Sequence, residues 1–77
     1  MFILTQDKGA TVNVGKVLSI ELAEPESREG VYRIMAVFDV KGTYELLGQY
    51  IDGNIAKRMF EDIFDAQTRN VEALSMR

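Results

Sequence analysis

The chain has 77 residues, a formal net charge of −3 at pH 7, and neither histidine nor cysteine. This length suits a single domain, and the missing residue types exclude disulfide bonds and argue strongly against a structural zinc site. The acidic balance has the wrong sign for a general binder of nucleic acid or of anionic membranes. A domain of this size buries only a small core, so association with a partner subunit is the one common source of added stability left open.

The composition predicts a globular domain, because 47% of the residues are hydrophobic and 27% are charged. The first residues, Met1–Asp7, carry no basic segment of the kind that opens a signal peptide. No stretch approaches the ~18–20 consecutive apolar residues of a membrane span. We therefore expect a cytoplasmic protein that does not enter a membrane.

The N-terminal part of the chain is typical of short strands. Phe2–Gln6 is apolar, Asp7–Gly9 has the residues of a turn, and Thr11–Val14 is a return strand, which together predict a hairpin. Val17–Ala23 then alternates between apolar and polar residues, as a half-buried strand does. Its apolar face consists of Leu18, Ile20 and Leu22.

A polar loop over Glu24–Gly30 separates this strand from the next two. Val31–Val40 and Thr43–Ile51 are the predicted strands, and Lys41-Gly42 forms the turn between them. Their alternation assigns one set of residues to the core: Tyr32, Ile34, Ala36, Phe38, Tyr44, Leu46, Gly48 and Tyr50.

The pattern changes to a helical period after residue 51. Asp52 is the predicted N-cap of a helix that runs to about residue 69. Phe60 and Phe64 are expected to pack against Ile34, Phe38 and Leu46. The apolar stripe of the helix consists of Ile55, Ala56, Met59, Phe60, Ile63 and Phe64.

These elements predict one α+β domain over residues 1–77. Residues 1–51 form strands and turns, residues 52–69 form the helix, and residues 70–77 form a tail or a helix extension. We expect an antiparallel sheet of about five strands with a C-terminal amphipathic helix packed on one face. Curling of this sheet into a partial barrel is the alternative that the pattern leaves open.

The residues needed for common catalytic mechanisms are missing. Without histidine or cysteine, the usual catalytic triads cannot form, and nothing points to a Ser–Lys pair. Gly9–Lys16 has the wrong spacing for a phosphate-binding loop, and Asp52-Gly53-Asn54 lacks the later ligands of a calcium loop. We expect no enzyme activity, no cofactor and no metal.

Two apolar surfaces are left over by the predicted packing. The first is the sheet face that points away from the helix, and it comprises Val31, Met35, Val37 and Leu47. Either the partial barrel buries this face, or it binds a partner or a second copy. The second surface is the helix end, where Val71 and Leu74 continue a heptad spacing unless Asn70 ends the helix.

The order of the apolar segments also carries a resemblance. The segments are Phe2–Asp7, Thr11–Val14 with Val17–Ile20, Tyr32–Phe38, and Leu47–Tyr50 before the helix around Ala56-Lys57. Over residues 2–64 this order resembles a group of small uncharacterised proteins of Gram-positive bacteria and their phages or mobile elements. The resemblance implies the same strand-rich, helix-last layout and favours a phage or prophage origin. It implies no activity, cofactor or site.

Two classes of function follow from these observations. The favoured hypothesis is a non-catalytic protein-interaction module, such as a phage-derived accessory or inhibitor protein, whose partner is a foreign protein or a second copy. One form is an acidic inhibitor whose carboxylates replace phosphates, namely those of Glu24, Glu26, Glu29, Glu61, Asp62 and Asp65. The alternative is nucleic-acid binding by the sheet, with Arg33 and Lys41 as phosphate contacts.

Overall fold

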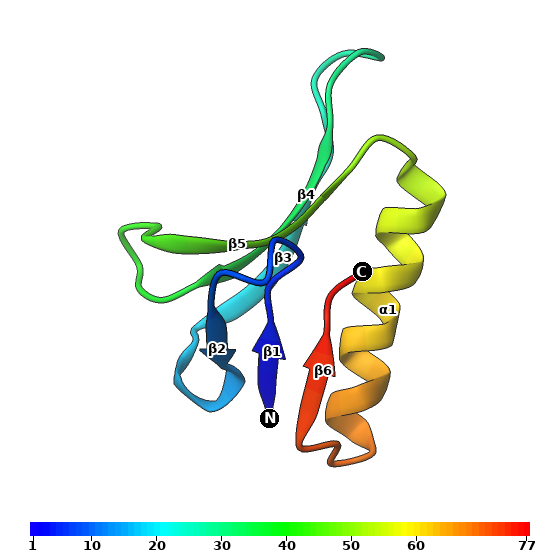
Figure 1. The fold of residues 1–77 in the computed structure, drawn as a ribbon. Helices are drawn as coiled ribbons and strands as arrows, with labels where there is room; N and C mark the ends of the chain where they lie inside the picture. The colour runs from blue at the N-terminus through cyan, green and yellow to red at the C-terminus, as the bar shows by residue number, and fades with distance from the viewer.

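A computed structural model describes all residues from 1 to 77 and confirms the α+β class (Figure 1). Six strands form two three-stranded sheets, with orders β2-β1-β6 and β3-β4-β5. The prediction of one sheet of about five strands is therefore wrong, and the strands form no closed barrel. The elements are β1 (Phe2–Leu4), β2 (Thr11–Asn13), the 3-10 helix η1 (Val14–Lys16), β3 (Ser19–Ala23), β4 (Tyr32–Val37), β5 (Tyr44–Tyr50), α1 (Gly53–Thr68) and β6 (Ala73–Ser75).

The first sheet joins the two ends of the chain. β1 pairs antiparallel with β2, as the predicted hairpin requires, and parallel with β6, so that Ile3 lies opposite Leu74. Residues 70–77 are thus neither a loose tail nor a helix extension. Figure 1 shows β6 beside β1, where the N-terminal and C-terminal segments run together.

The helix ends because Asn70 adopts a left-handed conformation, with φ of 56°. The Val71 N–H then donates to the Ala66 carbonyl (3.0 Å), and the Asn70 N–H donates to the Gln67 carbonyl (3.2 Å). These two bonds are those of a Schellman motif, in which asparagine is a common substitute for glycine. The turn directs the chain back toward β1, so the heptad spacing does not continue as a helix.

The second sheet contains a bulge that changes which residues face the core. Ile34 pairs with Gly48 but Met35 pairs with Leu46, so Leu47 is an extra residue on β5. Leu47 is 0% exposed, which contradicts its predicted place on the outer face. On the other side of the bulge the alternation is reversed, so Tyr44 and Leu46 are exposed rather than buried.

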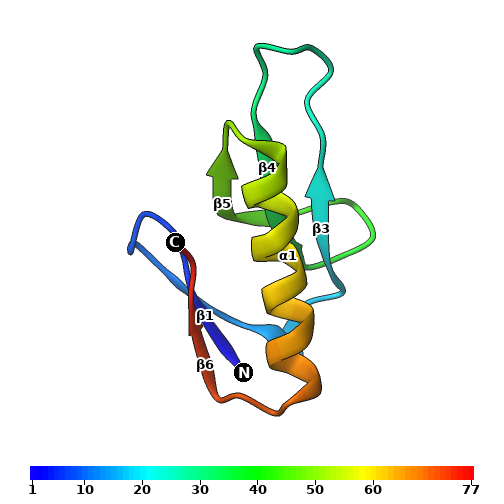
Figure 2. The ribbon, with the colours of Figure 1, turned by 90° about the vertical axis from the view of Figure 1, so that its right-hand side faces the viewer.

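The helix α1 packs on β3, β4 and β5 (Figure 2). Asp52 is the N-cap, as predicted, and its Oδ1 accepts the N–H groups of Asn54 (2.8 Å) and Ile55 (3.4 Å). The buried face of α1 is narrower than the predicted stripe. It consists of Ala56, Met59, Ile63 and Ala66.

Phe64 is therefore not a core residue. It is 68% exposed, and Ile55 on the opposite flank of α1 is 56% exposed, whereas Phe60 is half-buried against the core. The physical reason is the width of the sheet: β3 is its last strand, so no further strand lies under Phe64. Phe38 is also exposed, at the end of β4.

The core lies between α1 and the two sheets. Met76 closes it from the C-terminal side with a fully buried side chain, and its N–H donates to the Leu4 carbonyl (2.9 Å). α1 lacks the combination of length and apolar character that crossing a bilayer requires. The core cluster comprises Ile3, Val12, Val14, Ile34, Ala36, Leu47, Tyr50, Ala56, Met59, Ile63 and Met76.

Candidate functional site

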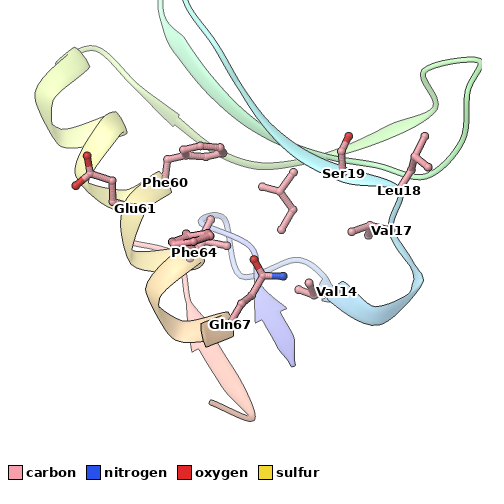
Figure 3. Close-up of a pocket in the computed structure, with 10 residues that line it drawn as sticks. Val14, Val17, Leu18, Ser19, Phe60, Glu61, Phe64 and Gln67 are labelled. Atoms are coloured by element: carbon pink, nitrogen blue, oxygen red, sulfur yellow. The ribbon is translucent and has the colours of Figure 1, made fainter. Parts of the chain in front are cut away.

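An apolar groove lies between α1 and the segment that leads from η1 into β3 (Figure 3). Its volume is about 460 Å³. We call it the α1–β3 groove. Its lining consists of Val14, Val17, Leu18, Ser19, Ile20, Phe60, Glu61, Ile63, Phe64 and Gln67.

The helix wall of the groove is aromatic. Phe60 and Phe64 are one turn apart on α1, so their rings lie next to each other along the groove, as Figure 3 shows. Ile63 lies between them in sequence and belongs to the core. An exposed phenylalanine beside a core that already buries its neighbours offers apolar area to another molecule.

The strand wall of the groove is the free edge of β3. This strand pairs only with β4, so the backbone groups on its other side have no strand partner. Leu18, directly before β3, is 60% exposed. Natural edge strands usually carry lysine, proline or a bulge that prevents further pairing, but between Leu18 and Ala23 the only charged residue is Glu21.

The charges around the groove are few and unpaired. Glu61 lies on the helix wall and is the only charged side chain that lines the groove. The one ion pair of the molecule, Arg69–Asp65 at 3.0 Å, is elsewhere on α1. Ser19 donates to the Glu21 carboxylate (2.7 Å), so its hydroxyl is already engaged. The groove thus presents apolar area and backbone groups rather than a polar binding pocket.

The predicted outer-face residues are divided by the structure. Met35 and Val37 lie on the face of β4 that points away from α1, and both are half-buried. Val31 is half-buried just before β4, beside the acidic loop. Leu47 is in the core instead, because of the bulge.

The bulge supplies replacements for Leu47 on this face. Tyr44 pairs with Val37 and Leu46 pairs with Met35, so the four side chains form a small apolar surface that we call the outer sheet patch. The sequence pattern placed Tyr44 and Leu46 in the core because strict alternation contains no extra residue.

The predicted helix-end surface does not exist in the expected form. Val71 follows the turn at Asn70 and is half-buried. Leu74 is in β6, where it packs against the core and pairs with Ile3. Neither residue belongs to β4 or β5, the two strands that carry the outer sheet patch.

Leu18, Phe60 and Phe64 are the site residues that sequence reasoning missed, because it assigned them to the core. A signal for them was present in the width of the helix stripe, which spans both Ile55 and Phe64. A three-stranded sheet is too narrow to cover an apolar stripe of that width.

No arrangement of acid–base groups accompanies these surfaces. The hydrogen bond from the Thr5 hydroxyl, followed by that from the Gly9 N–H, lowers the pKa of Asp7 within a turn. Hydrogen bonds from Thr43 lower the pKa of Asp39 in the same manner. No three carboxylates converge on a site where a metal ion would fit.

The Tyr50 hydroxyl is the one buried side-chain polar group without a hydrogen-bond partner. Burial raises the pKa of this phenol. It lies close to Gly48, where a Cβ atom would be 2.8 Å from the Tyr50 Oη. No groove reaches it, so it is part of the core packing.

Comparison of the chain with protein-family models, with curated proteins and with solved structures finds no match in any of the three.

Proposed function

We propose that this protein is a non-catalytic protein-interaction module that takes up an extended apolar segment of chain in the α1–β3 groove. The observation that carries the proposal is the free edge of β3 beside a groove in which Phe64 is 68% exposed. Backbone hydrogen bonds and apolar contacts would then be made by the same bound segment.

Strand addition is the binding mode that this geometry supports. An extended segment placed along a sheet edge makes backbone hydrogen bonds that are independent of sequence, and alternate side chains enter neighbouring pockets and give specificity. Here the edge is β3, and the side chains that point toward α1 would meet Phe60 and Phe64. The segment would replace the strand that the second sheet lacks.

The chemistry of the groove favours a chain segment over a polar small molecule. Pockets for metabolites normally combine apolar walls with several polar groups that converge on the ligand. In the α1–β3 groove the Ser19 hydroxyl is engaged with Glu21, which leaves Glu61 and Gln67 on the helix wall. Such a lining recognises apolar side chains and discriminates weakly among polar groups.

A display library of random twelve-residue peptides tests the proposal. Binders selected on the protein should alternate apolar and polar residues, and their binding should be lost in Phe64→Glu, which places a charge in the groove. Ile55→Glu is the matched control, because Ile55 is similarly exposed on the other flank of α1 and does not line the groove. Fluorescence anisotropy with each labelled peptide gives the affinities.

The proposal is wrong if the library yields no binders, or if Phe64→Glu and Ile55→Glu bind the selected peptides equally well. Circular dichroism of both variants shows whether the fold is retained. Because both positions are exposed, we expect both variants to fold as the parent protein does.

A further inference from the structure

We propose that the α1–β3 groove takes up a segment of one particular chemistry: an extended strand in which apolar residues alternate with lysine or arginine. The apolar residues would enter the groove, and a basic residue would lie on the opposite face of the sheet, beside Glu21 of β3. This inference rests on the proposed function, since it names the class of partner for the same groove.

The backbone groups of β3 that are free to bind a strand follow from the pairing of β4. The Phe38 N–H, just after β4, donates to the Thr43 carbonyl (2.8 Å), and backbone groups alternate between the two sides of an antiparallel strand. The even-numbered residues of β4 therefore bond to β5, and the odd-numbered ones bond to β3. Because these pair with the odd-numbered residues of β3, the N–H and C=O groups of Ile20 and Leu22 are left at the free edge.

Glu21 is the middle residue of β3 and lies on the outer face of the sheet, where it pairs with Met35. Its exposed carboxylate accepts the Ser19 hydroxyl (2.7 Å) and forms no ion pair. Because the backbone groups of Glu21 bond to β4, an antiparallel segment would place a residue opposite it in a non-hydrogen-bonded pair. In such pairs the Cα atoms are only about 4.5 Å apart and the side chains are closest. An opposite charge at that position stabilises the pairing, and a like charge destabilises it.

The charged side chains that line the hollows beside this edge are all acidic. Glu61 is the only one in the α1–β3 groove, and Glu21 and Asp39 are the only ones in the hollow on the outer face of the sheet. Leu18 borders both hollows, so they lie on the two sides of the same edge. A segment bound at this edge is thus flanked by carboxylates on both faces, and basic residues complement both.

Two cations neighbour β3 in sequence or in register, and neither forms an ion pair with Glu21. Lys16 precedes β3, but it belongs to η1 and lines a separate hollow beside β2. Arg33 pairs with Ala23 at the end of β3, and its Nε donates to the Gln49 side chain on β5 (3.3 Å), on the other side of β4. The charge of Glu21 is therefore left for an incoming strand to neutralise.

Peptides selected from the random twelve-residue library test this inference. We expect the polar positions of the alternating binders to carry lysine or arginine far more often than aspartate or glutamate. Glu21→Lys should weaken the binding of such a peptide several-fold, because it places like charges opposite each other. Glu26→Lys is the matched control: it makes the same change of charge at an exposed position of the loop after β3, outside both hollows. Since salt screens exposed charges beyond roughly 8 Å, this control should leave the affinity within about twofold.

A charge exchange between protein and peptide locates the contact. Each basic residue of the peptide is replaced in turn by glutamate, and one replacement should weaken binding to the parent protein but restore binding to Glu21→Lys. A ligand that only filled the groove would contact Phe64 but not the outer face of the sheet, so it would not respond to Glu21. Phe64→Ser, which changes no charge, should weaken the same peptide as well. Loss of affinity at both positions then requires a segment that lies along the edge of β3.

Three outcomes would overturn the inference: selected peptides without an excess of basic residues, equal binding to Glu21→Lys and Glu26→Lys, or a charge exchange that restores no binding. In each of these cases, peptides that still lose affinity in Phe64→Ser refute the basic segment but retain the interaction function. A library that yields no binders refutes both.

Discussion

At the scale of single residues, Leu47 determines how the two sheets meet. Its carbonyl accepts the Gln6 N–H (2.8 Å), and the Gln6 side chain in turn accepts the Gln49 N–H (2.8 Å). Because the bulge leaves Leu47 out of the pairing with β4, its carbonyl is available to the chain that leaves β1. One extra residue thus both fills the core and connects the sheets.

The turn after β1 predicts a dependence on pH. The Asp7 carboxylate accepts the Thr5 hydroxyl (2.7 Å) and the Gly9 N–H (2.8 Å), and these bonds lower its pKa from the ordinary value of 3.8. A pKa lowered by folding means that Asp7 contributes its full stabilisation above pH 3.8. This contribution is lost as the pH falls through the folded-state pKa.

Thr5→Val removes the larger of these two causes. We expect the pKa of Asp7 to rise toward 3.8 in this variant, as measured by NMR titration of the carboxyl carbon. Asp39 is the internal control, because its pKa is lowered by Thr43 and not by Thr5. An Asp7 titration that is the same in the parent and the variant would contradict this account.

At the scale of elements, local signals predicted α1 and the strand pair β4–β5 but not β6. The N-cap, the helical period and the Lys41-Gly42 turn are all contained in short stretches of sequence. β6 has only three residues and pairs with β1, about 70 positions earlier, so no local pattern records the contact. Parallel pairing between distant segments is specified by burial in the folded chain rather than by neighbours in sequence.

Met76 predicts how much this distant pairing contributes. Its side chain is fully buried, so Met76→Ala should lower the free energy of unfolding by about 2–5 kcal/mol in a chemical denaturation experiment. Arg77→Ala, one residue further along and exposed, should change it by no more than about 0.5 kcal/mol. Similar values for the two variants would show that the C-terminal segment does not stabilise the fold.

At the scale of the whole molecule, the sequence predicted that an apolar surface is left exposed, but it did not predict which residues form that surface. The excess of apolar residues over the area of a small sheet was visible in the sequence, and it indicated that some surface is left over. Which surface that is depends on two facts that alternation cannot supply: the bulge at Leu47 and the position of β3 at an edge. Met35 and Val37 of the predicted surface do lie on the outer face of the sheet, whereas Leu47 is buried in the core. Phe64, which the prediction assigned to the core, is exposed.

The net charge predicts the outcome for the alternative function. With a charge of −3, the protein should show no binding to a labelled single-stranded oligonucleotide by fluorescence anisotropy, even at low salt. Binding that weakens steeply as salt is added would instead support recognition by the sheet. Arg33→Ala and Lys41→Ala would then identify the phosphate contacts, since each should reduce the salt slope.

The pairing of β6 with β1 also has a consequence for synthesis of the protein on the ribosome. β1 is made first, but its parallel neighbour and Met76 are made after all the other elements. At the ~5–20 residues per second of translation, Ile3 waits for several seconds before its partner strand exists. During this time the edge of β1 that later pairs with β6 is uncovered, and this is the period when chaperones act on a nascent chain. Folding of this domain is therefore expected to finish only once its last strand has left the exit tunnel.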